Sequence, residues 1–110
     1  MKTIYLDHAA TTPIDKDVLS CMHPYWGSKY GNPSSMHASG RRAARAIAEA
    51  RSSLAACIGA FDDEIIFTGS GTESDNLAIL GVARAYTPSG KHIIISAIEH
   101  ESILATAKDL

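Results

Sequence analysis

The residues with the clearest chemical potential lie in the segment Ile65–Asn76, which reads IIFTGSGTESDN. A β-branched apolar run leads into a turn with Gly69 and Gly71, and a helical pattern follows. The first N–H groups of a helix lack partners and the helix dipole adds positive charge there, so this turn predicts an anion site. The glycines would allow φ > 0 and close approach of a ligand. Ser70 and Glu73 have the S-x-x-E spacing of a capping box, which predicts the start of the helix.

The residue types that this loop does not contain limit which anions it could bind. The loop lacks the Gly-Lys-Ser/Thr ending of a nucleotide triphosphate loop. Ser74 stands where a dinucleotide-binding loop would have its third glycine. Another phosphate-bearing ligand would fit, and the alternative is a well-capped strand-to-helix turn with no ligand. The loop by itself leaves both interpretations open.

Several helices are predicted from hydrophobic periodicity and from turn residues. Asp15 can cap a helix that runs to about Met22, and a long helix spans about Ala38–Ile58. Gly59 supplies the end of that long helix. Another helix spans about Glu73–Tyr86. A further helical pattern begins after residue 100, with apolar residues at 103, 104, 107 and 110.

Two segments are predicted to be strands, Glu64–Thr68 and His92–Ser96, after a short extended piece at Thr3–Leu6. Their apolar residues are consecutive, which is typical of strands buried on both faces of a parallel sheet. The order strand, helix, strand predicts an α/β fold with a right-handed connection. Two strands rarely form a stable sheet, and the last helical pattern has no stop signal. We therefore expect these residues to be part of a longer protein.

Composition argues against several classes of protein. The net charge of −2 does not favour a nucleic-acid partner. No apolar stretch approaches the ~20 residues of a membrane span, and no signal or transit segment opens the sequence. The histidines lack the spacing of metal ligands, so no metal site is predicted. We expect a cytoplasmic protein without a membrane or nucleic-acid partner.

The two cysteines, Cys21 and Cys57, are far apart and form no C-x-x-C motif. They are interpreted as reduced thiols in packing positions, since Cys57 lies between Ala56 and Ile58 near the end of the long helix. Neither cysteine is assigned a catalytic role.

Four motifs, in order, resemble the N-terminal part of the cysteine desulfurases, in the class V aminotransferase group of pyridoxal phosphate (PLP) enzymes. The motifs are YLDHAATTP at 5–13, GNPSSMHASG at 31–40, the loop at 65–76, and KHIIISAIEHESIL at 91–104. They cover nearly all of the 110 residues. Because four ordered motifs agree, the resemblance is much more specific than the loop alone.

The resemblance implies an α/β fold, the N-terminal part of the large domain of a fold type I PLP-dependent transferase with a mostly parallel sheet and flanking helices. Residues 1–14 would be an extended segment of the small domain or active-site rim. Residues 15–110 would be the first part of the PLP-binding large domain, truncated. The parent enzyme would be a homodimer.

The implied reaction converts L-cysteine to L-alanine. The sulfur passes as a persulfide to an acceptor or scaffold protein, for iron–sulfur cluster or thio-cofactor synthesis. One alternative is another class V PLP enzyme, such as a selenocysteine lyase, and another is a non-catalytic fragment. None of the lysines lies in the family's cofactor-lysine motif, and neither cysteine lies in its nucleophile motif. The 110 residues alone are therefore expected to be inactive.

The resemblance also implies roles for individual residues. Gly71 and Thr72 would hold the PLP phosphate, and His100 would stack on the PLP ring and help to move protons. The alternative for His100 is a helix-start histidine bonded to Glu99 or Glu101. The order Gly69-Ser70 is the reverse of the family's frequent Ser-Gly, which makes a separate role for Ser70 uncertain.

A second group of polar residues would border the substrate pocket by the same resemblance. Asp, Asn, Thr and Pro in these loops can equally serve tight turns, and the sequence leaves both roles open. The group comprises His8, Thr11, Thr12, Asn32 and His37.

Overall fold

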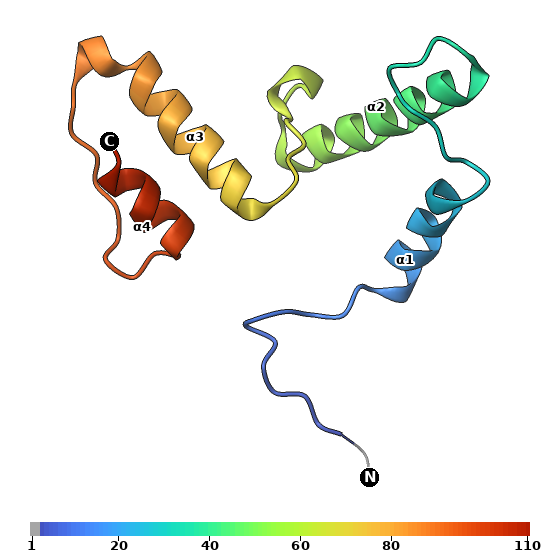
Figure 1. Cartoon of the computed structure of the whole chain (residues 1–110), viewed down its shortest axis with the longest axis horizontal. Helices are drawn as coiled ribbons and strands as arrows, with labels where there is room; N and C mark the ends of the chain where they lie inside the picture. Colours follow the sequence, from blue (N-terminus) through green and yellow to red (C-terminus); the bar gives the residue numbers. More distant parts are fainter. Residues whose placement is uncertain (1–2) are drawn as a thin grey trace. The chain divides into compact units, whose positions relative to one another are not determined.

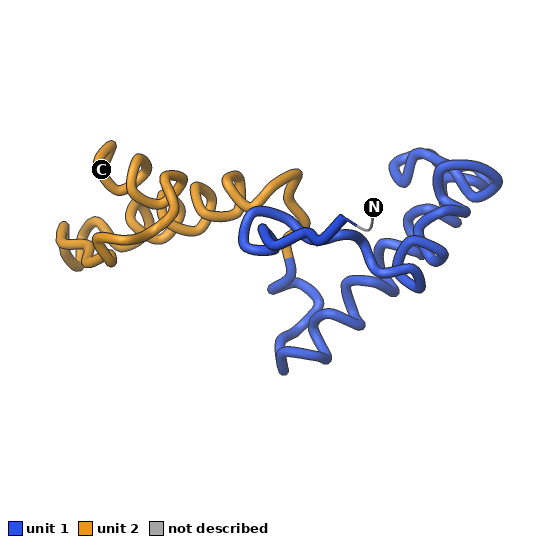
Figure 2. The backbone as a smooth tube through the Cα atoms, turned by 90° about the horizontal axis from the view of Figure 1, so that it is seen from below, with its two compact units in different colours: residues 1–65 blue, residues 66–110 orange. Residues whose placement is uncertain are grey.

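Four α-helices and three short 3₁₀ turns account for the regular structure of the computed structural model, which describes residues 3–110 (Figure 1). The chain divides into two compact units, residues 1–65 and 66–110 (Figure 2). The predicted division at residue 14 stays a prediction, and residues 1 and 2 of that segment lie outside the described residues.

The first unit contains helices α1 (Lys16–Met22) and α2 (Ala38–Ile58). Asp15 caps α1 as predicted, because its Oδ1 accepts a hydrogen bond from the Asp17 N–H at 2.8 Å. The predicted bounds of α2 are confirmed. Gly59 ends α2 in the left-handed conformation, with φ 69° and ψ 30°, where a side chain would be strained.

Close backbone contact shapes the N-terminal end of α2. Gly40 is buried, and a Cβ placed on it would lie 2.1 Å from the Ser35 carbonyl oxygen. Only glycine lets the loop before α2 come this near to the helix. At the other end, the 3₁₀ turn Asp62–Glu64 lies against α2, where the Ser52 hydroxyl donates to the Asp62 carboxylate.

The second unit contains helices α3 (Gly71–Ala85) and α4 (Glu101–Lys108), which contact each other. Helix α3 begins two residues before Glu73, the predicted first residue of the helix, and Ser70 of the predicted capping box is its N-cap. The 3₁₀ turn Thr87–Ser89 follows α3, and an irregular segment then leads to α4 (Figure 1).

The prediction of strands is wrong for this structure. Neither 64–68 nor 92–96 is a strand, and residues 3–110 contain no β-ladder. Ile66 is 66% exposed and Ile94 is 85% exposed, so these runs are not buried on two faces. A strand needs a neighbouring backbone for its hydrogen bonds, and no such neighbour flanks either run among the described residues.

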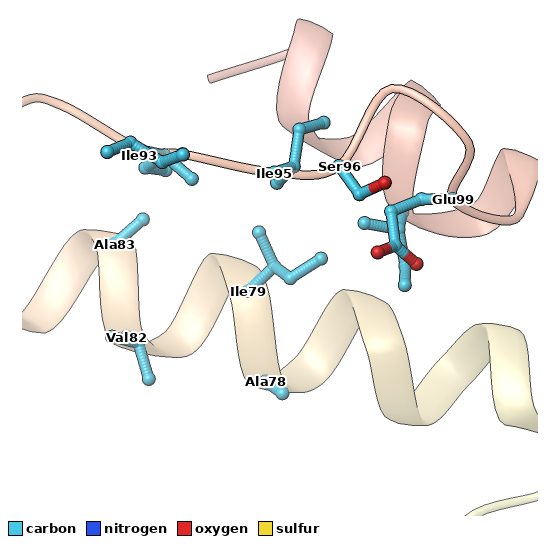
Figure 3. A pocket seen from close by; sticks show the side chains of 10 residues that line it. Ala78, Ile79, Val82, Ala83, Ile93, Ile95, Ser96 and Glu99 are labelled. Carbon is cyan, nitrogen blue, oxygen red and sulfur yellow. The ribbon is translucent and has the colours of Figure 1, made fainter.

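The segment after α3 instead forms one side of an open apolar groove of about 510 Å³. Ile79 and Ala83 of α3 point toward Ile93 and Ile95 on the facing segment (Figure 3). Ile95 is still 38% exposed, so the groove covers these side chains only in part.

Few side chains are buried in the described part of the chain. Ala43 and Ala55, both on α2, are the buried apolar residues. Cys21 and Cys57 are exposed free thiols, so their predicted packing is wrong: within residues 3–110, the elements that contact α1 and α2 are short 3₁₀ turns, which leave both thiols open. No helix within residues 3–110 is long and apolar enough to cross a membrane.

Candidate functional site

The turn before α3 leaves two backbone donors available. Ser70 is extended, with φ −164° and ψ 163°, and its Oγ accepts from the Glu73 N–H at 3.2 Å. The first helical bond runs from the Ser74 N–H to the Ser70 carbonyl at 3.1 Å. The N–H groups of Gly71 and Thr72 precede this bond, so they have no acceptor within the helix.

The two glycines of the loop act differently from the prediction. Within residues 3–110, Gly59 is the glycine in the left-handed region, so the prediction that Gly69 and Gly71 adopt such a conformation is wrong. Gly71 already belongs to the helix, where φ is negative. A Cβ on Gly71 would meet nothing within 4 Å. The backbone there is open to a ligand, as the anion-site prediction requires.

The capping box is confirmed on one side only. The Ser70 hydroxyl accepts from Glu73 N–H as predicted, but the Glu73 carboxylate does not return to the Ser70 N–H. It accepts instead from the N–H of Gly69, one residue earlier, at 2.6 Å. This bond occupies the Gly69 N–H, and it leaves the N–H groups of Gly71 and Thr72 at the helix start without an acceptor in the helix.

Hydroxyl and amide side chains hold the loop in place. Thr68 Oγ1 lies 2.6 Å from Ser74 Oγ and donates to the Ser70 carbonyl at 3.1 Å. Asn76 Nδ2 donates to the Thr72 carbonyl at 2.8 Å. The Thr72 side chain itself is exposed and its hydroxyl can reach a ligand.

His100 is the N-cap of α4, which is the helix-start position of the alternative interpretation. Its partner, however, is neither Glu99 nor Glu101. The Ser102 N–H points toward Nδ1, with the two nitrogens 3.1 Å apart, and Ser102 Oγ lies 2.8 Å from Nδ1. The imidazole is exposed, so capping through Nδ1 leaves Nε2 and the ring faces available to a ligand.

Two polar contacts join α4 to the first turns of α3, and sequence reasoning missed both. Ser102 Oγ donates to Asp75 Oδ2 at 2.5 Å, and Thr106 Oγ1 donates to Asn76 Oδ1 at 2.8 Å. Both hydroxyl residues are buried, Ser102 at 8% and Thr106 at 4% exposure. Ser102 and Thr106 are four residues apart, which places both hydroxyls on one face of the helix and could have indicated these contacts. Only the apolar residues of α4 were used to predict this helix from the sequence.

These contacts bring His100 into the neighbourhood of the loop. Ser102 links His100 to Asp75, one turn after Gly71 along α3. Asn76 links Thr106 to the carbonyl of Thr72. The three predicted cofactor residues therefore belong to one hydrogen-bonded region of the second unit.

The rim candidates lie in the first unit, where local contacts account for several of them. His8 packs edge-on against Tyr5, with ring centres 4.9 Å apart. Asn32 Oδ1 accepts from the Ser34 N–H at 2.9 Å, and His37 caps α2 through the Gly40 N–H at 3.4 Å. Thr11 and Thr12 are exposed. Turn and cap roles thus explain Asn32 and His37, and pocket roles stay a prediction.

The family model of the class-V aminotransferases matches residues 4–110. The chain belongs to this family. Curated relatives include a putative cysteine desulfurase IscS 1 of Bacillus subtilis, 52% identical over 100% of this chain, and a cysteine desulfurase IscS of Dictyoglomus turgidum, 54% identical over 94%. A cysteine desulfurase of a Nostoc species is 46% identical over 100% of the chain.

A solved structure extends this family assignment to the fold. The chain matches a NifS-like protein with a TM-score of 0.89 and 38% identity over 96% of its residues. The match confirms the predicted fold class, that of the fold type I PLP-dependent transferases. The class-V chain spans 29% of that protein, and 29%, 26% and 27% of the three curated relatives.

Within residues 3–110 of this class-V chain, no three histidine, cysteine, aspartate or glutamate side chains gather to hold a metal ion. The groove beside α3 is lined mostly by alanine and isoleucine, and the loop residues do not line it. Gly71, Thr72 and His100 stay the predicted ligand-binding residues.

Proposed function

We propose that this chain is the N-terminal part of a PLP-dependent cysteine desulfurase. The observation that carries the proposal is the pair of helix-start donors at Gly71 and Thr72, joined through α3 and α4 to His100. The identity of the chain to proteins named as cysteine desulfurases supports the same reaction.

The residues present fit the phosphate group of PLP. An exposed helix start without a Cβ at Gly71 gives a dianion room to approach the N–H groups of Gly71 and Thr72. The helix dipole contributes roughly 0.3–2 kcal/mol to such binding. Each charge-assisted hydrogen bond adds roughly 1.5–3 kcal/mol. The Thr72 hydroxyl would supply one of these bonds, and the two N–H groups the others.

When bound, PLP supplies an electron sink for bond cleavage at the substrate. His100 would lie against the cofactor ring and accept or return a proton at Nε2, since Nδ1 faces Ser102. The hydrogen bonds through Ser102 fix the imidazole relative to α3, so the proton is moved by a preorganised group.

The proposed substrate is L-cysteine and the product L-alanine. The C–S bond of the substrate is replaced by C–H, while a protein thiol bonds to the released sulfur as a persulfide. That persulfide passes to an acceptor or scaffold protein for iron–sulfur cluster or thio-cofactor synthesis. The full-length protein acts in the cytoplasm as a homodimer.

The test uses the full-length, PLP-loaded protein and measures alanine release from L-cysteine together with PLP content. Thr72→Ala removes one charge-assisted bond and should weaken PLP retention by roughly 1–3 kcal/mol. His100→Ala should leave much of the PLP bound and lower the rate. Turnover of L-selenocysteine without turnover of L-cysteine would replace the proposed substrate.

Matched controls lie in the same unit. Thr87→Ala removes a hydroxyl that bonds only to the Ala83 carbonyl, and His92→Ala removes an exposed imidazole. Both controls should keep PLP content and rate. If Thr72→Ala and His100→Ala behaved like these controls, the assignment of the site would be wrong.

A further inference from the structure

A buried hydroxyl joins a carboxylate to the imidazole of His100. Ser102 Oγ lies 2.5 Å from Asp75 Oδ2 and 2.8 Å from His100 Nδ1. The Ser102 N–H also lies 3.1 Å from the same nitrogen. Because Ser102 is 8% exposed, water competes weakly for these bonds.

The single proton of the Ser102 hydroxyl decides how these bonds are directed. An ionised Asp75 can only accept, so Ser102 Oγ–H donates to Oδ2. Oγ then offers only lone pairs to His100, and Nδ1 must carry a proton to bond with it. The Ser102 N–H favours the opposite state, in which Nδ1 holds a lone pair.

The two demands on Nδ1 are unequal. The contact with Oγ is the shorter, at 2.8 Å against 3.1 Å for the backbone N–H. The hydroxyl is also polarised by a charged acceptor, and such charge-assisted bonds are stronger than neutral ones. The carboxylate of Asp75 therefore decides the competition in favour of the Nδ1–H form.

We propose that Asp75 and Ser102 are positioning residues that keep a proton on Nδ1 of His100 and leave Nε2 as the nitrogen with the lone pair. The inference rests on the proposed role of His100 at the cofactor. Without Asp75 and Ser102 Oγ, the backbone N–H would donate to an unprotonated Nδ1, and Nε2 would carry the proton. Asp75 and Ser102 thus decide whether Nε2 starts the reaction as a base or as an acid.

The test is nitrogen NMR of the full-length protein labelled with ¹⁵N in its histidine rings, without PLP and with PLP. A pH of about 8.5 lies above the ordinary range of histidine titration, so the neutral ring is observed. His100→Gln identifies the His100 signals. The wild type should show the proton on Nδ1, whereas Asp75→Leu, which has no acceptor for the Ser102 hydroxyl, and Ser102→Ala should each move it to Nε2. Both variants should also lower turnover by about tenfold or more.

Further variants separate positioning from stability. Thr106→Val removes the other hydroxyl bond between α3 and α4 without touching His100, and it should leave the His100 signals unchanged. Ser102→Thr keeps the hydroxyl and should keep the wild-type proton position, which covers the case in which Ser102→Ala fails to fold.

A wild-type proton on Nε2, or an unchanged proton position in folded Asp75→Leu, would overturn the inference. Full turnover by His100→Gln would instead overturn the proposed role of His100. In that case the NMR result would still report the proton position separately.

Discussion

The two units of this chain hold their helices by different means. In the first unit, α2 is fixed by a close backbone approach at Gly40 and by buried alanines such as Ala55. In the second unit, α4 is tied to α3 by the bonds Asp75–Ser102 and Asn76–Thr106. Close packing is prominent in the first unit, which also has the hydrogen bond from Ser52 to Asp62, whereas directed polar bonds join the two helices of the second unit.

The candidate site lies in the unit with directed bonds, and physical reasons favour that placement. A hydrogen bond specifies the orientation and the proton of each partner, whereas contact between alanines specifies only distance. His100 needs a defined orientation to serve a cofactor, and Ser102 provides one. The buried residues of α2 are glycine and alanine, which have no polar side-chain group to orient.

The largest effect on stability is expected when these 110 residues are produced without the rest of the protein. Ala43 and Ala55 are the buried apolar residues of the described chain, so hydrophobic stabilisation is small. Backbone ordering costs about 1–2 kcal/mol per residue. We expect the isolated 110 residues to be partly helical, prone to aggregation, and without a cooperative melt in calorimetry. A single sharp two-state transition of a monomer would show that the units form a domain by themselves.

Gly40→Ala tests the close approach of the first unit. The new Cβ would lie 2.1 Å from the Ser35 carbonyl oxygen, so the loop or the helix start must move. We expect α2 to lose about 3 kcal/mol or more of protection against hydrogen exchange in the full-length protein. Unchanged exchange rates along α2 would mean that the loop before it is not fixed by this contact.

Ser102→Ala and Thr106→Val test the directed bonds of the second unit. Ser102→Ala leaves the Asp75 carboxylate without its hydroxyl donor, and should lower stability by roughly 1–3 kcal/mol. Thr106→Val should lower it by about 1 kcal/mol, because Asn76 keeps its bond to the Thr72 carbonyl. Denaturant unfolding of the full-length protein measures both changes in the free energy of unfolding. Equal losses would contradict the expectation that the bond to the Asp75 carboxylate contributes more than the bond to Asn76.

Gly81→Ala should have the smallest effect and the opposite sign. Gly81 lies inside α3, and a Cβ on it would meet nothing within 4 Å. Alanine is the better helix former by roughly 0.5–1 kcal/mol, so exchange along α3 should slow by that amount. Destabilisation would reveal a close contact at this face of α3, and the second unit would then depend on shape as well.

Local signals explain why the helices could be predicted from the sequence. Asp15 caps α1 through the Asp17 N–H, and Gly59 ends α2 in the left-handed conformation. Ser70 caps α3 and places Gly71 and Thr72 at its start, as the loop predicts. These features involve residues a few positions apart, so the order of residue types contains the needed information.

Sequence reasoning was wrong where the outcome depends on distant partners. Consecutive isoleucines at 93–95 indicated a strand, but a strand forms only when another backbone lies beside it. Cys57 was expected to be packed, yet its side chain is exposed. Apolar residue types are often buried, but whether a given side chain is buried depends on what the rest of the fold places against it.

The sequence by itself therefore determined the helices, the caps at Asp15, Ser70 and Gly59, and the resemblance to a family. Only the tertiary structure decided that Ser102 would meet both Asp75 and His100, and that Thr106 would meet Asn76. The physical reason is separation along the chain. Asp75 and Ser102 are 27 residues apart, and no local periodicity encodes which hydroxyl will face which carboxylate once two helices pack.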